Sequence, residues 1–152
     1  VMCAAPEYLA RNGEPKTMAD LEELPAAAYS SSHIRFESIS YIDDKGEPQE
    51  QPINPVFKSN DGEALVEKVL SHNAFMTAPA FFFAKPMEES DLVPILTDVN
   101  LPDYSAMYAV YPHRDLPVRT RLFLDAARHY IGDKTPIWER NIPNIERLYQ
   151  QK

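Results

Sequence analysis

A run of four polar residues is the part of the sequence whose residue types best suit ligand binding. Ser30, Ser31, Ser32 and His33 follow a short apolar segment, 26–30, that is predicted to be a buried strand. Ligands of open α/β sheets bind beyond the carboxyl ends of the strands. Serine hydroxyls and free backbone N–H groups can hold a carboxylate without a buried cation. These four residues are therefore candidate ligand contacts, and a solvated polar loop is the alternative.

Four further positions have side chains that suit a ligand site but also have ordinary structural explanations. Thr77 can donate a hydrogen bond, and Met76 can adapt to an apolar ligand, although both also fit a packed core. Asn60 is predicted first as the N-cap of a helix, with Glu63 completing a capping box, and only second as a ligand contact. Tyr108 is a candidate for a hinge or a cleft floor, and plain packing is its alternative.

Other chemistry is not indicated. The four histidines lack metal-ligand spacing, no nucleophile elbow, phosphate loop or dinucleotide turn occurs, and no catalytic residue, metal or cofactor is predicted. The single cysteine, Cys3, is expected to be a buried inert thiol. A net charge of −8 argues against nucleic-acid binding by this piece itself. No apolar run is long enough for a membrane span, and a cytoplasmic location is expected.

Strands alternate with helices along the chain, which predicts an α/β fold with a mostly parallel sheet. Helices are expected to begin at Pro6, after Thr17, at Asn60 and at Pro117. A turn at 43–46 is expected to join two strands into a hairpin. The predicted strands cover residues 1–4, 26–30, 36–42, 53–58, 75–78, 93–96 and 107–111.

Several segments, in order along the chain, resemble the effector-binding domain of LysR-type transcriptional regulators. CAAPEYLARNG at 3–13 is similar to the family's CASPAYLARHG, and NDGEAL at 60–65 matches its helix start. DLVPIL at 91–96 resembles GRLVPVL, and YAVYP at 108–112 matches the same letters in the family. PIWER at 136–140 resembles the late PPWD segment.

The resemblance implies a periplasmic-binding-protein-like (type 2) architecture of two Rossmann-like α/β lobes, with a mixed sheet and an effector cleft between the lobes. Residues 1–106 would form lobe II, and 107–152 would return to lobe I as a crossover strand, a helix and a tail. The start of lobe I and a winged helix-turn-helix would precede Val1. DNA would be contacted only through that missing domain. A homodimer or homotetramer is expected for the full-length protein.

The chain departs from the family where GLGIALLP is usual and HNAFMTAP stands at 72–79. His72 and Ala74 replace both glycines, so we expect the backbone there to avoid glycine-only conformations. A transport-type solute-binding protein with the same fold is the alternative function. An enzyme of the same α/β class is a third reading, without a supporting set of residues.

Overall fold

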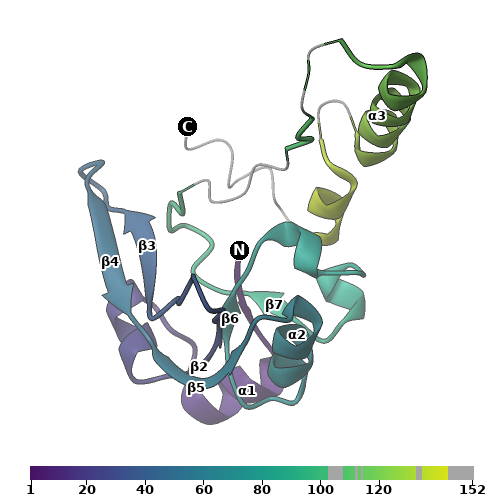
Figure 1. The fold of residues 1–152 in the computed structure, drawn as a ribbon. Coiled ribbons are helices and arrows are strands. Elements are labelled where there is room, and N and C mark those ends of the chain that lie inside the picture. The colour runs from purple at the N-terminus through teal and green to yellow at the C-terminus, as the bar shows by residue number, and fades with distance from the viewer. Residues whose placement is uncertain (103–107, 112, 114, 133–134, 144–152) are drawn as a thin grey trace.

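A mixed five-stranded sheet organises the protein in the computed structural model, which describes residues 1–102, 108–111, 113, 115–132 and 135–143. Strand β2 (Pro25–Tyr29) pairs in parallel with β5 (Asn54–Ser59). A single parallel bridge between Ala26 and Phe75 joins β2 to the segment that continues as β6 (Met76–Thr77). These three strands therefore run in the same direction (Figure 1).

The other two strands extend the sheet beyond β6. Strand β1 (Met2–Ala4) is antiparallel both to β6 and to β7 (Val93–Pro94). The strand order is thus β5-β2-β6-β1-β7, in which only β1 runs in the opposite direction. The predicted mixed sheet is confirmed, and the carboxyl ends of β5, β2, β6 and β7 lie at one edge.

Neighbouring residues along each strand belong to different halves of the core, because successive side chains of a strand point to opposite faces. Met2 and Ala4 pack in one buried cluster, and Cys3 packs in the other. Ala26 and Ala27 divide in the same way. The sheet is therefore covered on both faces, as expected of a largely parallel sheet.

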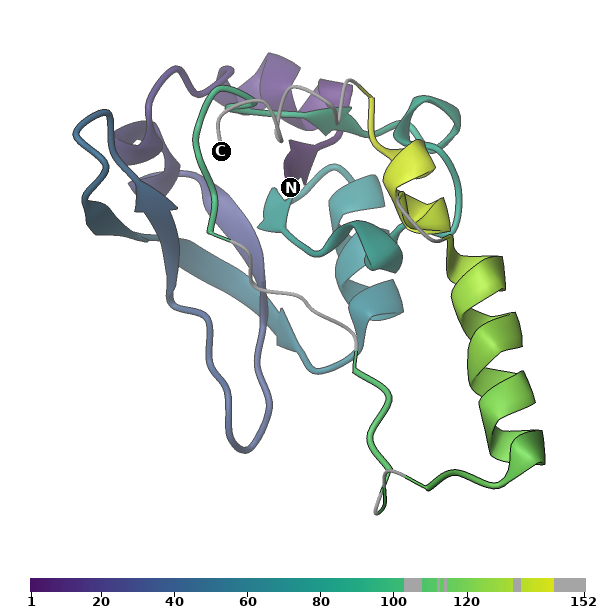
Figure 2. The same ribbon diagram turned by 90° about the horizontal axis from the view of Figure 1, so that it is seen from above.

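Helix α1 (Pro6–Asn12) and the 3₁₀ helix η1 (Met18–Glu22) cover the first face. Tyr8 of α1 is fully buried there, and its hydroxyl donates to the carbonyl of Pro25 at 2.9 Å. Helix α2 (Gly62–Leu70) covers the second face through Leu65 and Val69 (Figure 2).

The hairpin is formed by other residues than expected. Strand β3 (Ser38–Ile42) pairs with β4 (Pro48–Pro52), whereas the predicted return segment 53–58 is part of β5 in the main sheet. The segment 53–58 was chosen because it is more apolar than 48–52. That apolar character instead suits the main sheet, where β5 pairs with the distant strand β2. The predicted turn is confirmed, since Gly46 has a φ of 81° and its N–H donates to the Asp43 carbonyl.

Helix α3 (Val118–Ile131) lies apart from the sheet (Figure 1). None of its residues is buried, and Gly132 ends it as predicted. Residues 108–111 are not a strand, which corrects that prediction; Met107 lies outside the described residues. Val110 is 93% exposed, and among the described residues no strand pairs with 108–111.

Three short 3₁₀ helices complete the structure: η2 (Ala80–Phe82), η3 (Met87–Glu89) and η4 (Ile137–Asn141). The last of them docks on η2. The rings of Trp138 and Phe81 meet edge to face at 6.2 Å, and the Asn141 amide donates to the Phe83 carbonyl. Ile142 is 4% exposed and belongs to the core cluster on the α2 side.

Candidate functional site

Polar residues follow adjacent parallel strands at the point where each strand ends. The register pairs Tyr29 with Ser59, and the Ser30 N–H donates to the Ser59 carbonyl at 2.9 Å. Ser30 follows β2, Asn60 follows β5, and Thr77 ends β6. We call the set Ser30–His33, Asn60 and Thr77 the carboxyl edge. It is where an open α/β sheet places its ligand.

Residues 30–33 already use several of their hydrogen-bonding groups within the protein. The Ser31 hydroxyl oxygen accepts from the N–H groups of His33 and Ile34 at 3.3 and 3.1 Å, and the Ser31 N–H donates to the Ile34 carbonyl. The expectation of free backbone N–H groups is thus wrong for Ser30, Ser31 and His33. Ser32 and His33 are exposed and Ser30 is half-buried, so side chains remain as the means of ligand contact.

Asp61, and not Asn60, caps helix α2. Its carboxylate accepts from the N–H groups of Glu63 and Ala64 at 2.9 and 3.4 Å. Glu63 is therefore the second residue of the helix, and the predicted capping box is wrong. A carboxylate is favoured here because it also meets the positive end of the helix dipole. Asn60 is exposed and keeps its amide for other contacts.

Of the three remaining predicted residues, Met76 and Tyr108 lie away from this edge. Met76 is 1% exposed and packs with Leu65 and Val69 beneath α2, which supports the packing alternative. Thr77 is half-buried beside Met2 of β1. Tyr108 is 82% exposed and stands on neither a strand nor a helix. The structure therefore places Ser30–His33 and Asn60 after the adjacent strands β2 and β5, with Thr77 at the end of β6.

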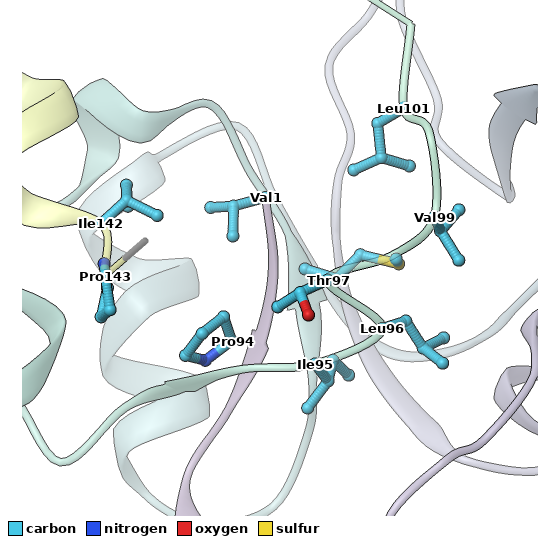
Figure 3. A pocket seen from close by; sticks show the side chains of 10 residues that line it. Val1, Pro94, Ile95, Leu96, Thr97, Val99, Leu101, Ile142 and Pro143 are labelled. Carbon is cyan, nitrogen blue, oxygen red and sulfur yellow. The ribbon is translucent and has the colours of Figure 1, made fainter. Parts of the chain in front are cut away.

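A small apolar cavity of about 60 Å³ lies at the same edge, beside β1 and β7 (Figure 3). Ligand pockets usually measure about 300–1,000 Å³, so this cavity alone holds no metabolite of ordinary size. Thr97 supplies the only hydroxyl among its lining side chains. The lining residues are Val1, Met2, Pro94, Ile95, Leu96, Thr97, Val99, Leu101, Ile142 and Pro143.

Sequence reasoning missed Thr97, although a usable signal was present. The segment 93–96 was predicted to be a strand, and Thr97 directly follows it. The rule that selected Ser30–His33 from the end of the preceding strand applies equally to this residue.

The single cysteine lies inside the core. Cys3 is fully buried, as expected, and burial raises the pKa of its thiol to about 12. Within the described ranges, no group of three His, Cys, Asp or Glu side chains could hold a metal ion. None of the helices in this part of the chain is long and apolar enough to cross a membrane.

A mixed sheet covered on both faces, with polar residues following the carboxyl ends of its strands, is the architecture in which open α/β sheets place their ligand sites. Residues 1–131 match the family model of the LysR substrate binding domain. The chain therefore belongs to the LysR substrate-binding domain family, as the sequence motifs predicted.

Curated relatives are similar over most of this chain. The HTH-type transcriptional regulator CrgA of Neisseria meningitidis serogroup B is 26% identical over 133 residues, which are 86% of this chain and 43% of CrgA. The HTH-type transcriptional regulator DmlR of Escherichia coli is 23% identical over 90% of this chain and 44% of DmlR. The chain thus spans less than half the length of these relatives.

Solved structures show the same fold. The regulatory domain of CrgA matches with a TM-score of 0.65 at 24% identity, over 86% of this chain and 64% of that domain. The regulatory domain of AphB from Vibrio vulnificus matches with a TM-score of 0.63 at 22% identity, over 86% of this chain and 63% of that domain. The predicted periplasmic-binding-protein-like fold is confirmed.

Proposed function

We propose that this domain senses a small-molecule effector on behalf of a LysR-type transcriptional regulator. The observation that carries the proposal is the carboxyl edge, where Ser30–His33, Asn60 and Thr77 stand at the ends of adjacent parallel strands in a chain of this family. Effector binding would favour one arrangement of the regulator over another, and so alter transcription.

The edge favours a small polar effector, such as a carboxylate. Hydroxyl and amide groups recognise an anion without the desolvation cost of a buried cation. Lys58, the lysine of the strand leading to Asn60, already pairs with Glu37 at 3.0 Å. Neutral donors, together with the exposed His33, are therefore the groups assigned to ligand contact.

The domain division predicted from the sequence becomes part of the proposal. Residues 1–106 would form one lobe, and the chain from 107 would return to the other lobe, with Tyr108 at the crossover. Against this division, η4 and Ile142 pack on the first lobe, on η2 and on the α2 side of its core. The exposed apolar side of α3 supports the division, because Leu122 and Phe123 are 63% and 71% exposed and lack a packing surface. The small size of the edge cavity also supports a cleft that the second lobe completes.

The partners follow from the relatives. CrgA and DmlR are HTH-type transcriptional regulators, of which this chain matches 43% and 44%. We assign DNA contact to a separate N-terminal domain, since this piece carries a net charge of −8. The full-length protein would be a cytoplasmic homodimer or homotetramer.

A thermal-shift screen with a library of small organic acids tests the proposal. The screen is run on this chain and on a longer polypeptide that adds the upstream part of the regulatory domain. We expect hits on the longer polypeptide, and a Ser32→Leu/Asn60→Leu variant should lose them. Hits that survive this variant unchanged would place the ligand away from the carboxyl edge.

A further inference from the structure

His72 holds two acidic side chains from different parts of the fold. Its Nδ1 lies 2.8 Å from the carboxylate of Glu7 in α1. Its Nε2 lies 3.2 Å from the carboxylate of Asp91, in the turn between η3 and β7. A neutral imidazole has one N–H donor and one acceptor nitrogen, whereas an imidazolium has two donors. Only the protonated ring can donate to both carboxylates.

The backbone at both ends of this contact is strained. His72 has a φ of 61° and Asp91 a φ of 51°, in the left-handed region that side chains other than glycine seldom adopt. The φ of His72 lies in the part of this region that histidine can adopt, so the expectation that position 72 avoids glycine-only conformations is not contradicted. Such strain persists where the surroundings over-determine it. The Arg11 guanidinium adds one such restraint by donating to the His72 carbonyl.

Charged groups from three parts of the fold surround the ring. Glu7 and Asp91 supply two negative groups, and His72 directly follows the C-terminal end of α2, whose carbonyls carry partial negative charge. Arg11 of α1 is the opposing positive group, and it is bonded to the backbone carbonyl. The ring itself is sheltered, since the His72 side chain is 28% exposed against 62% and 63% for the two carboxylates.

We propose that His72 is a pH-sensitive clamp. When charged, it ties α1, the end of α2 and the Asp91 turn together; as the pH rises and the ring becomes neutral, one of the two contacts is lost. Histidine side chains in general change charge between about pH 5 and 8, and this sets the pH values of the test. Because α2 (Gly62–Leu70) follows its N-cap Asp61 and its C-cap Ser71 precedes His72, the clamp would control how firmly this helix is held.

Thermal melting of this chain at pH 5.5 and pH 8.5 tests the clamp. His72→Asn removes the charge but keeps a residue that tolerates a positive φ. We expect this variant to melt about 2–4 °C below the parent at pH 5.5, and clearly closer to it at pH 8.5. Glu7→Gln/Asp91→Asn should reproduce the pattern. His113→Asn, at an exposed position, is the matched control and should show no such dependence.

An equal loss for His72→Asn at both pH values would make His72 a structural residue only and overturn the clamp. Ring ¹⁵N chemical shifts of the parent protein give an independent test that no variant's folding can disturb. A doubly protonated His72 ring at pH 5.5 that loses a proton by pH 8.5 supports the proposal. A single neutral tautomer at pH 5.5 contradicts it.

Discussion

Asp61 has two functions at the start of α2. Its carboxylate satisfies the N–H groups of Glu63 and Ala64, which the helix cannot pair internally, and its own N–H donates to the Ser59 hydroxyl at 3.0 Å. It thereby fixes the junction between β5 and α2. Asn60, one residue earlier, is exposed and is not the N-cap of the helix.

Because Asp61 is the N-cap, we expect substitutions of Asp61 and Asn60 to have different effects on stability. Asp61→Ala should lower the free energy of unfolding by about 1 kcal/mol, because two N–H groups lose their acceptor. Asn60→Ala should change it by less than about 0.5 kcal/mol, as is usual at an exposed site. Urea unfolding of both variants measures this directly. The reverse order of the two effects would restore Asn60 as the cap.

Asp20 predicts an acid dependence of stability. Hydrogen bonds from the backbone N–H groups of Lys16 and Thr17 hold the pKa of its carboxyl below the usual value. Since the folded pKa is the lower one, the stabilisation is complete above the unfolded pKa, near 3.9. It is lost as the pH falls through the folded pKa.

Asp20→Asn should therefore be less stable than the parent at pH 7, and the two should converge below about pH 4. Melting temperatures from pH 7 to pH 2.5 measure the difference. Glu14→Gln, at an exposed residue in the same loop, is a suitable control. A gap between parent and Asp20→Asn that stays constant to pH 2.5 would mean that the charge of Asp20 is irrelevant.

At the scale of elements, the sequence predicts local structure better than strand pairing. Helices α1, α2 and α3 follow from apolar spacing and from punctuation by Pro6, Gly13 and Gly132. The hairpin partner was misassigned because β4 is rich in Gln, Glu and Pro, so its pairing with β3 depends on the turn and not on its hydrophobicity. The parallel pairing of β2 with β5 joins distant segments that no local pattern links.

The candidate site was predictable to a similar extent. Because a ligand loop follows a strand end, the position of Ser30–His33 could be predicted from the strand alone. The internal hydrogen bonds of Ser31 could not, since they depend on the turn that the loop adopts. Met76 is buried because it lies on the sheet face that α2 covers. A strand that is apolar on both faces gives no sequence signal for which face meets α2.

We expect Ile142, which lies beyond the residues matched by the family model, to stabilise the fold. Ile142 lies outside residues 1–131 but is 4% exposed in the core. Ile142→Ala should cost about 2 kcal/mol, the lower end of the range for buried isoleucine at the edge of a core. Arg140→Ala, at an exposed neighbour, should be nearly neutral. Equal, negligible effects in urea unfolding would show that the segment is not docked in solution.

At the scale of the whole molecule, the apolar side of α3 determines the behaviour of the isolated chain. Leu122, Phe123 and Tyr130 are 63%, 71% and 74% exposed on one side of the helix. Exposed apolar patches of this kind mark interaction surfaces. In the regulator, we assign the missing surface to the other lobe.

The isolated chain is therefore expected to self-associate, with an average mass that rises with concentration in light scattering. Phe123→Glu should shift it toward the monomer, because burying a carboxylate in an apolar contact is costly. Arg121→Glu, on the opposite side of α3, should leave association largely unchanged. A parent chain that stays monomeric throughout the concentration range contradicts this prediction.

The central claim is that the carboxyl edge is the ligand-contacting wall of an effector-sensing domain. Backbone amide chemical shifts, followed during titration of the longer polypeptide with the strongest hit of the organic-acid screen, test it most directly. We expect the largest changes in this lobe at Ser30–His33, Asn60 and Thr77. Changes concentrated instead on the β3–β4 hairpin or around Glu7 and His72, with the carboxyl edge silent, would contradict it.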